Sequence, residues 1–332
     1  MKFDIPSEMN AVFVDPATGR LIAQKVPTPR PAKGEVLVKM TAAPVNPSDL
    51  ARIRELQPSE AEGFIPGVEG CGTVVSAGKG ILPAIFLGKR VACSSKYTAR
   101  GTWAEYMVTP AGSCFPIGSK ISDEQASMAI VNPLTALALC DIAKGQGHRA
   151  VVVTAAGGAL GKMISSLLIK EDIKVLHVVR NAEGVKKLRD RQIEDILDSS
   201  SKDFLFKFKE WCHKHQATLV LDAIGGELVN PIIPILPVNS AILLYGNLSQ
   251  TPVQFMPPQL VRESKTVTGF FLGHWLEGQG MLRNIRSLLK VRKLLKYGME
   301  TYVQATFPLA EAQKAAEVYE SGMGKGKVLL TM

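Results

Sequence analysis

A run of small residues follows the most apolar strand-like segment of the chain. Residues 151–153 are three valines, and residues 154–161 then read Thr-Ala-Ala-Gly-Gly-Ala-Leu-Gly. Beyond this run, leucine, isoleucine and methionine recur at helical spacing as far as residue 168. A strand, a tight turn and a helix in this order present backbone N–H groups at the helix N-terminus, where they bind phosphate oxygens. We therefore expect the pyrophosphate of a dinucleotide to lie against this turn.

The glycines of this turn have separate tasks in the expected cradle. A Cβ at Gly158 would hold the pyrophosphate away from the backbone, whereas Gly161 lets the helix pack against the strand. The stretch resembles a Rossmann fingerprint in which Ala155 replaces the first glycine. Because turns are rich in glycine anyway, an ordinary turn remains the alternative. The residues expected to line the cofactor here are Ala155, Gly157, Gly158, Ala159, Leu160 and Gly161.

The residue at the end of the next expected strand indicates which dinucleotide is bound. An NAD-selective site carries an aspartate or glutamate there, about 20 residues after the glycines, to bind the ribose 2′-hydroxyl. This chain has Val179-Arg180-Asn181 instead. A guanidinium binds phosphate through paired, charge-assisted hydrogen bonds. Arg180 therefore predicts NADPH, with Lys186 and Lys187 adding charge nearby; the alternative is that Arg180 is only a solvated residue at a strand end.

Composition and charge exclude several classes of protein. The 332 residues are 46% hydrophobic, which indicates about two packed domains rather than a disordered chain. The net charge of +9 suits an anionic ligand, but it does not demand a nucleic acid, and we expect none. Five cysteines without a Cys-x-x-Cys pair exclude a full disulfide framework and favour a reducing compartment.

Neither a membrane span nor a targeting segment is expected. The longest apolar stretch, residues 126–140, is broken by Asn132-Pro133 and falls short of the roughly 20 residues that a membrane crossing needs. Residues 1–10 lack the apolar core of a secretory signal and the arginine-rich character of a transit peptide. We expect a cytoplasmic protein, with a mitochondrial location left open.

Two kinds of architecture must position these residues. Up to about residue 120, short β-like runs separated by proline and glycine predict a turn-rich, all-β unit. From residue 122, helices and strands alternate, which predicts a parallel sheet wrapped by helices. After about residue 275 we expect a basic helix over 281–296, a strand near Tyr302, a helix over 309–319 and a final strand over 327–330.

Several further motifs, modest alone, become specific through their order and spacing. Together they resemble the zinc-independent quinone oxidoreductase and enoyl reductase branch of the medium-chain dehydrogenase/reductase superfamily. The resemblance implies an α/β fold with a GroES-like β-rich catalytic domain (1–122 and 274–332), a Rossmann doubly wound parallel-sheet domain (123–273), and an active-site cleft at their junction. The motifs span residues 43–49, 66–70, 88–92, 101–106, 132–136, 222–226 and 269–272.

The resemblance also implies roles for individual residues. Asn46 and Thr135 are expected beside the nicotinamide as catalytic residues, with Asn132 near. Two alternatives stay open: an Asn-Pro pair, as at Asn46 and Asn132, often only initiates a turn, and Thr135 could be just a helix-start residue. Backbone at the carboxyl ends of the parallel strands is expected to line the cofactor, namely at Ala223, Ile224, Tyr245, Gly246, Phe271 and Leu272.

Zinc-dependent relatives differ at two positions that matter for the chemistry. They place a cysteine near position 46 and a histidine just before Glu69, where this chain has Asn46 and Val68. Neither side chain is a credible zinc ligand, so we expect no metal, and alcohol dehydrogenation is disfavoured. What remains is hydride transfer to a substrate that is already electrophilic, such as a quinone or an α,β-unsaturated carbonyl.

Two other functions remain open. The 2-enoyl thioester reductases of fatty acid metabolism are similar to this chain, but they carry a tyrosine soon after the Asn-Pro-Ser-Asp segment, and residues 51–63 contain none. Tyr97 is a candidate substitute hydrogen-bond donor, although a surface-loop tyrosine is the simpler interpretation. The third hypothesis is a catalytically silent, NADPH-binding structural or regulatory subunit, because no unmistakable proton donor is present.

Three remaining features bear on partners. The basic helix over 281–296 could face a membrane surface, RNA or an acidic protein, but the solvated face of a packed helix is the simpler interpretation. Cys212-His213-Lys214-His215 offers too few ligands to predict a metal site. Apolar strands over 241–244 and 267–272 fall where relatives pair sheet edges, and an unprotected apolar edge invites association, so we expect a homodimer.

Overall fold

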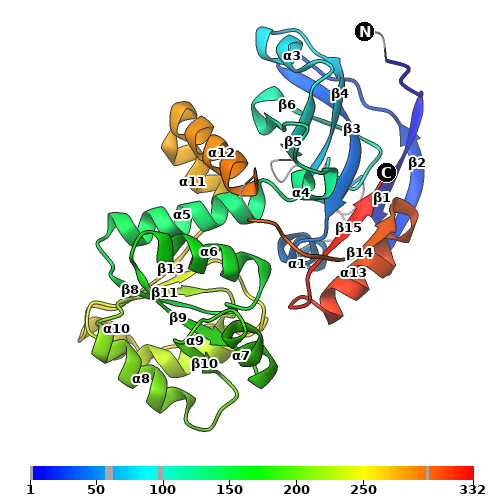
Figure 1. The fold of residues 1–332 in the computed structure, drawn as a ribbon. Coiled ribbons are helices and arrows are strands. Elements are labelled where there is room, and N and C mark those ends of the chain that lie inside the picture. Colours follow the sequence, from blue (N-terminus) through cyan, green and yellow to red (C-terminus); the bar gives the residue numbers. More distant parts are fainter. Residues whose placement is uncertain (1–2, 57–62, 96–99, 297–298) are drawn as a thin grey trace. The chain divides into compact units, whose positions relative to one another are not determined.

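The computed structural model describes residues 3–56, 63–95, 100–296 and 299–332 (Figure 1). The chain divides into two compact units, which we call the β-rich unit (Met1–Leu134 and Met281–Met332) and the parallel-sheet unit (Thr135–Gly280). The predicted mixed α/β class is confirmed, because one unit is built on a mainly antiparallel sheet and the other on a wholly parallel one. The domain boundaries predicted from the sequence, 122/123 and 273/274, lie earlier than these divisions.

Both ends of the chain contribute to the sheet of the β-rich unit. Its strands run in the order β14-β15-β3-β4-β5-β7, with β6 paired to β3, and β1 and β2 form a separate antiparallel pair. The last strand, β15, is antiparallel to β3, with Leu329 opposite Pro44. The strands are β1 (Glu8–Val14), β2 (Leu21–Pro27), β3 (Glu35–Pro44), β4 (Glu69–Ala77), β5 (Arg90–Ser94), β6 (Tyr106–Pro110), β7 (Cys114–Pro116), β14 (Val303–Pro308) and β15 (Lys327–Thr331).

An apolar core fixes this sheet against helix α13. The fully buried Trp103 lies in it with Val328, Leu330 and Tyr319, and the Trp103 indole N–H donates to the Pro44 carbonyl at 3.2 Å. A buried indole is stable when its N–H has such an acceptor. The helices of the unit are α1 (Pro47–Glu55), α3 (Ile81–Phe86), α4 (Asp123–Ser127), α12 (Met281–Lys296) and α13 (Ala312–Ser321), with 3₁₀ turns at Ala111–Ser113 and Leu309–Glu311.

The parallel-sheet unit has the strand order β10-β9-β8-β11-β12-β13. Helices cover both faces: α6 lies on one, and α8 and α9 pack on the other, where Phe208 meets Val152 and Val220 (Figure 1). The strands are β8 (Ala150–Val153), β9 (Lys174–Val179), β10 (Ile196–Asp198), β11 (Leu219–Asp222), β12 (Ala241–Leu244) and β13 (Thr266–Gly269). The helices are α6 (Ala159–Lys170), α7 (Ala182–Arg189), α8 (Phe204–His215), α9 (Gly226–Ile232), α10 (Pro257–Val261) and α11 (Leu272–Gln279).

Several element boundaries differ from the sequence-based prediction. The strand expected over 267–272 ends at Gly269, and Leu272 begins α11 with Phe271 as its N-cap. The apolar run continues through both elements, and an apolar run alone does not mark where a strand gives way to a helix. Helix α5 (Val131–Gly145) contains the division between the two units. Among the described residues, no helix is long and apolar enough to cross a membrane.

Candidate functional site: a dinucleotide cradle and a buried charge cluster

The turn after β8 is held in a conformation that few alanines adopt. Ala155 has φ 47°, in the left-handed region where the usual fingerprint has glycine. Its neighbours fix it: the Ala156 N–H donates to the Val178 carbonyl of β9 at 3.1 Å, and the Gly158 N–H donates to the Ala155 carbonyl at 2.9 Å. The chain is thereby turned directly into α6, with Gly158 as the N-cap residue. The first N–H groups of α6 have no intrahelical acceptors and are available to an anion.

Close backbone contacts explain two glycines of this turn, Gly158 and Gly161. A Cβ on Gly161 would lie 2.6 Å from the Ala155 carbonyl oxygen and 2.8 Å from the Ala156 Cα, which real structures do not tolerate. A Cβ on Gly158 would meet the Ala155 oxygen at 3.2 Å. The helix therefore packs directly on the strand-to-helix turn, and the space beside the turn is bounded by backbone. This geometry fits a pyrophosphate.

A buried hydrogen-bond network joins the ends of β8 and β11. The Thr154 hydroxyl donates to Asp222 Oδ1 at 2.7 Å and accepts the Ala223 N–H at 2.9 Å. The other carboxylate oxygen of Asp222 accepts the N–H groups of Ile224 and Gly225 at 3.0 and 2.7 Å. Burial raises the pKa of Asp222, and these hydrogen bonds oppose the rise. The network fixes the backbone at Ala223 and Ile224; the sequence analysis included Asp222 in a motif but assigned it no role.

Positive charges gather beside the cradle. Lys162, which follows Gly161 on α6, is half-buried, and its pKa is lowered by burial and by the nearby charges of Arg191 and Lys187. Lys187 also pairs with Glu183 at 2.6 Å. Arg180 is exposed directly after β9. Like charges held together repel one another, so an anion among them relieves the repulsion. Lys162 was not among the predicted cofactor residues. Its place in the first turn of the expected helix, where an anion would bind, could have indicated it.

In the β-rich unit, Asn46 belongs to a buried cluster of charges. Its side-chain oxygen accepts a hydrogen bond from the Lys327 ammonium, and its side-chain N–H donates to Glu69 Oε1 at 3.3 Å. Asn46 also begins α1, where its backbone N–H donates to Asp49 Oδ2 at 2.8 Å. Asn46 therefore starts a helix, which agrees with the alternative that its Asn-Pro pair initiates a turn. Its carboxamide is also held between the Lys327 ammonium and the Glu69 carboxylate. Lys327 additionally donates to the Val45 carbonyl at 3.4 Å and lies over the Tyr319 ring.

Burial and mutual attraction set the charge state of this cluster. Burial raises the pKa of Asp49 to about 7, despite the opposing effects of the Asn46 N–H and of Lys327. Burial likewise raises the pKa of Glu69 and lowers that of Lys327, while attraction between the carboxylates and the ammonium acts against both shifts. Two buried acids that share one buried base therefore favour retention of a proton on the acids near neutral pH.

Glu69 connects this cluster to the start of α5. Its second carboxylate oxygen accepts the N–H groups of Ile130 and Val131 at 3.0 and 2.9 Å. A carboxylate at a helix N-terminus satisfies free N–H groups and interacts favourably with the helix dipole. Asn132 is the second residue of α5 and Thr135 the fifth, so both lie on one face of the helix. Asn132 therefore lies in the first turn of the helix and Thr135 just beyond it, and their places beside the nicotinamide stay a prediction.

The other predicted cofactor residues gather at the carboxyl ends of the parallel strands. Ala223 and Ile224 follow β11, and Tyr245 and Gly246 follow β12. The Tyr245 N–H donates to the Asp222 carbonyl at 2.8 Å, which brings these two ends together. Phe271 and Leu272 follow the end of β13 by two and three residues, at the start of α11. Tyr97 lies outside the described residues.

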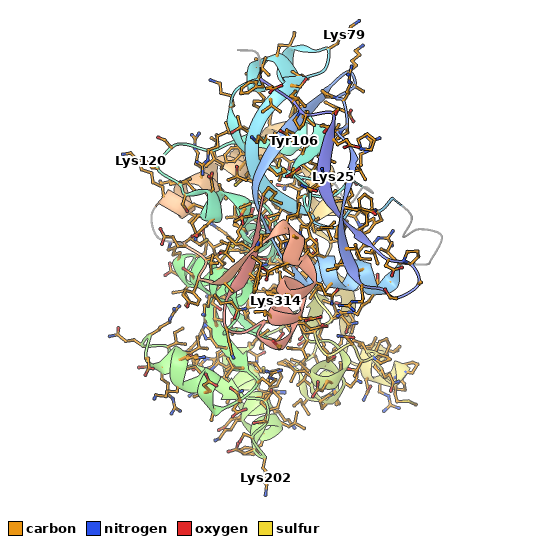
Figure 2. The ribbon with its side chains drawn as sticks, turned by 90° about the vertical axis from the view of Figure 1, so that its right-hand side faces the viewer. Lys25, Lys79, Tyr106, Lys120, Lys202 and Lys314 are labelled. Carbon is orange, nitrogen blue, oxygen red and sulfur yellow. The ribbon has the colours of Figure 1, made fainter. Side chains whose placement is uncertain are left out.

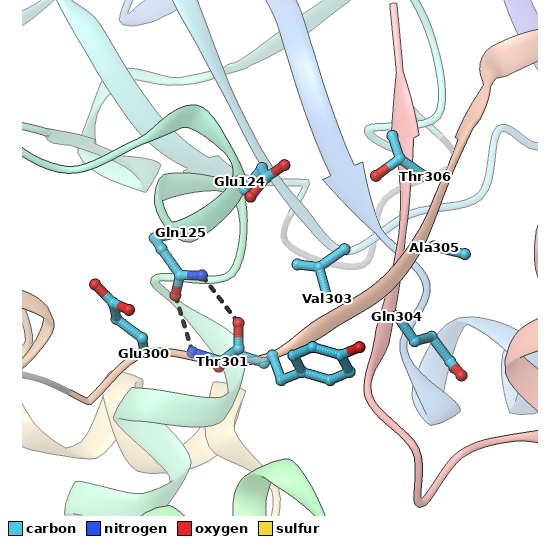
Figure 3. A pocket seen from close by; sticks show the side chains of 9 residues that line it. Glu124, Gln125, Glu300, Thr301, Val303, Gln304, Ala305 and Thr306 are labelled. Atoms are coloured by element: carbon cyan, nitrogen blue, oxygen red, sulfur yellow. Dashed lines mark hydrogen bonds between the residues drawn. The ribbon is translucent and has the colours of Figure 1, made fainter.

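A surface pocket of about 620 Å³ lies elsewhere in the β-rich unit (Figure 3). The Gln125 amide bridges the backbone of Thr301, donating to its carbonyl and accepting its N–H, each at 2.9 Å. No predicted site residue lines this pocket; its lining is Glu124, Gln125 and residues 300–306.

The segment Cys212-His213 does not form a metal site. Cys212 is buried in the core, and the His213 ring forms a hydrogen bond with the Ile235 carbonyl at 3.1 Å.

Comparison with known proteins identifies the family. Residues 32–119 match the model of the alcohol dehydrogenase GroES-like domain, and residues 159–287 match that of zinc-binding dehydrogenases. A structure from Mesorhizobium loti, named as a candidate NADPH:quinone reductase, is 30% identical with a TM-score of 0.89 over 99% of this chain and all of its own. The chain belongs to the medium-chain dehydrogenase/reductase superfamily. Within it, the chain falls in the zinc-independent quinone and enoyl reductase branch.

Two further relatives represent the two activities of this branch. A candidate NADPH:quinone reductase from Bacillus thuringiensis is 26% identical, with a TM-score of 0.84 over 98% of this chain and 99% of its own. The mitochondrial enoyl-[acyl-carrier-protein] reductase of Caenorhabditis elegans is 27% identical over 258 residues, covering 75% of this chain and 72% of that protein. Although one matching model is named for zinc binding, no group of three or more potential metal ligands occurs among the residues that the structure describes.

Asp49 gives the stability of the protein a specific dependence on pH. Its pKa is about 7 in the folded protein and 3.8 ordinarily, so between about pH 4 and pH 7 the folded state binds more protons. The stability that Asp49 contributes is therefore full below about pH 4 and is lost as the pH rises through 7. Asp49→Asn stays neutral and keeps an oxygen for the Asn46 N–H. We expect the unfolding free energy of this variant, relative to wild type, to rise from pH 4 to pH 7 in urea titrations.

The exposed Asp203 provides a control of opposite sign. The pKa of Asp203 is lowered by hydrogen bonds from Lys207 and Ser201, so its contribution is present at neutral pH and lost on acidification. The unfolding free energy of Asp203→Asn, relative to wild type, should therefore fall as the pH rises to about 4 and stay level above it. A difference between Asp49→Asn and wild type that does not vary with pH would show that Asp49 is ionised throughout.

Proposed function

We propose that this chain is a zinc-independent, NADPH-dependent reductase that transfers hydride to a quinone or another activated double bond. The observation that carries the proposal is the hydrogen bond that the Asn46 side-chain oxygen accepts. At the position where zinc-dependent relatives place a cysteine, this chain has a carboxamide whose oxygen accepts from the Lys327 ammonium. An ammonium bound at this oxygen is a poor neighbour for a metal cation. The names of the Mesorhizobium and Bacillus relatives, both candidate NADPH:quinone reductases, support the same activity.

The residues of the parallel-sheet unit fit NADPH. The N–H groups at the start of α6 would hold the pyrophosphate, and the lack of a Cβ at Gly158 keeps that approach open. Arg180, together with the positive group formed by Lys162, Lys187 and Arg191, would hold the 2′-phosphate. When bound, NADPH supplies the hydride. An electrophilic acceptor needs orientation and modest hydrogen bonding rather than a Lewis acid.

The catalytic roles of Asn46 and Thr135 are part of this proposal. The Asn46 amide nitrogen carries two N–H groups, of which one donates to Glu69. The other can donate to a carbonyl oxygen of the nicotinamide or of the substrate. Lys327 and Glu69 act as positioning residues, because they fix which end of the carboxamide is oxygen. Thr135 and Asn132, on one face of α5, would lie beside the nicotinamide.

Reduction of 2-enoyl thioesters is the second candidate. It is favoured by the identity to mitochondrial enoyl-[acyl-carrier-protein] reductases, including the one from Caenorhabditis elegans. It is weakened by the lack of a tyrosine in residues 51–63, where those enzymes carry one. The mitochondrial names belong to those relatives; the cytoplasmic location of this chain stays a prediction, with the mitochondrion as the alternative.

The two enzymatic functions and the catalytically silent alternative are separated by one assay. Purified protein is mixed with NADPH, and the absorbance of the reduced nicotinamide is followed after addition of a naphthoquinone or of crotonyl-CoA. Oxidation with the quinone and not with the thioester is the expected result. Oxidation with crotonyl-CoA alone would assign the second function. NADPH binding by calorimetry without either reaction would contradict both and leave the silent subunit.

We further propose that the protein is a homodimer. β13 lies at the edge of the parallel sheet and most of its residues are exposed, whereas β12 lies inside the sheet. An edge strand has unpaired N–H and carbonyl groups that a second copy can satisfy. In sedimentation velocity, a species of twice the 35.9 kDa chain mass is expected. A monomer at micromolar concentration would contradict this proposal.

Coenzyme choice tests the role of Arg180. Loss of a guanidinium that binds the 2′-phosphate should weaken NADPH and leave NADH, which lacks that phosphate, unaffected. For Arg180→Ala we expect the KM for NADPH to rise by about tenfold to a hundredfold, with little change for NADH. Steady-state kinetics with both coenzymes measure this. The matched control is Arg149→Ala, which removes an exposed arginine at the opposite, amino end of β8. Equal effects of Arg180→Ala on the two coenzymes would exclude the assigned role.

A further inference from the structure

The connection between β4 and β5 exposes an unusual amount of apolar surface. Within residues 81–87, the exposed fractions are 83% for Ile81, 57% for Ile85, 44% for Leu82 and 40% for Leu87. Connections between antiparallel strands are normally polar, and single exposed aliphatic residues need no explanation. Four within seven residues concentrate exposed apolar surface on one short connection, which usually marks an interaction surface. We call these four residues the apolar tip.

The apolar tip is held rigidly by buried neighbours. Pro83 and Phe86, on the other side of helix α3, are buried, and Phe86 joins the core of the β-rich unit. Glycines with positive φ bound the helix on both sides, Gly80 at 141° and Gly88 at 76°. The Gly88 N–H donates to the Val74 carbonyl of β4 at 2.9 Å. Helix α3 is therefore fixed to the core of the β-rich unit, and its exposed aliphatic side chains lie on an ordered element.

Lysines surround this tip. Lys79 and Lys89 flank α3 along the chain, and both are exposed. The exposed Lys33 belongs to a neighbouring turn, because the Gly34 N–H donates to the Lys79 carbonyl at 2.9 Å. The nearby carboxylate of Glu35 is engaged locally and accepts the Ala32 N–H at 2.9 Å. Figure 2 shows Lys79 extending from this end of the β-rich unit. Aliphatic side chains surrounded by ammonium groups are complementary to a surface with apolar material beneath anionic groups.

The tip lies at the opposite end of the β3–β4 pair from the candidate site. Val36 pairs with Ala77 near α3, whereas Ala42 pairs with Cys71 near Glu69. The nine residues of β4 separate the two ends by about 25–30 Å at the usual rise of a strand. A surface that binds the tip therefore leaves the Asn46 cluster uncovered. A firm contact at the tip is compatible with substrate turnover.

We propose that the apolar tip docks the protein on an anionic lipid surface, with Ile81, Leu82, Ile85 and Leu87 entering the interfacial region and the lysines contacting lipid phosphates. A lipid surface is favoured over a protein partner because the patch lies at the end of a strand connection, is small, and has cationic groups from two separate segments around it. A groove on a protein would need matching anions at fixed places, whereas an anionic bilayer provides them everywhere.

Sedimentation with vesicles tests this proposal. Full-length protein is mixed with vesicles of phosphatidylcholine alone or with about one-third phosphatidylglycerol, and the bound fraction is measured. We expect binding to the anionic vesicles that weakens with added salt and is much lower on neutral ones. Ile81→Ser combined with Ile85→Ser should reduce the partition coefficient by at least about tenfold. Lys79→Gln combined with Lys89→Gln should reduce binding to anionic vesicles only.

The matched control removes two exposed apolar residues from the other unit. Leu205 and Phe206 on α8 are 41% and 72% exposed, and replacing both by serine should leave vesicle binding unchanged. Without vesicles, thermal unfolding and the oxidation of NADPH by a naphthoquinone should be the same in all variants, which shows that each is folded. Absence of binding to anionic vesicles, or equal binding by wild type and the isoleucine variant, would overturn the proposal. A change in sedimentation coefficient with the isoleucine variant, without vesicle binding by wild type, would assign the tip to a contact between copies.

Discussion

The buried ammonium of Lys327 is the interaction on which the Asn46 cluster of the β-rich unit depends. It reaches the Asn46 side-chain oxygen and the Val45 carbonyl, and its charge faces Glu69 and Asp49. An ion placed in the protein interior without such partners costs several kcal/mol. Removing the ammonium would leave two buried acids without a counter-charge, so the cluster is stable only as a whole. The orientation of Asn46 is a consequence of this balance.

The parallel-sheet unit depends on a different constraint, the close approach of backbone to backbone. No Cβ fits at Gly161, and Ala155 is kept in a left-handed conformation by bonds to β9 and to Gly158. Thr154 and Asp222 then tie the ends of two neighbouring strands together. One unit thus presents neutral backbone donors in a fixed place, and the other a carboxamide fixed by charges. Both provide hydrogen-bond donors without a metal ion, which suits a carbonyl-containing acceptor.

Local sequence patterns were sufficient to predict much of the fold. The predicted helix over 281–296 has the bounds seen in α12, because it is delimited by clear breaks in periodicity. The apolar run from 267 to 272 has no such break, so its change from strand to helix was missed. The glycine turn was predictable because the strand, the turn and the helix are adjacent in sequence.

The partners of the site residues were not predictable in the same way. Lys327 meets Asn46 across 281 positions of sequence, and no local pattern indicates that a lysine in a terminal strand is buried. The amphipathic pattern over 281–296 places Leu282, Ile285, Leu289 and Leu295 opposite the basic residues. In α12, Leu295 is buried together with Ser287 and Val291, whereas Leu282, Ile285 and Leu289 are 70%, 45% and 43% exposed. Periodicity identified the helix, but the neighbouring elements decide which side is covered.

The order of the elements along the chain has a consequence for biosynthesis. The strand β15, Lys327–Thr331, pairs with β3 and β14 on its two sides and carries the cation of the Asn46 cluster. Until β15 has left the ribosome, β3 lacks one of its neighbours and two acids lack their counter-charge. The parallel-sheet unit, whose residues are all synthesised earlier, has no such dependence. The cofactor cradle can therefore form before the Asn46 cluster, which is completed only once β15 has been synthesised.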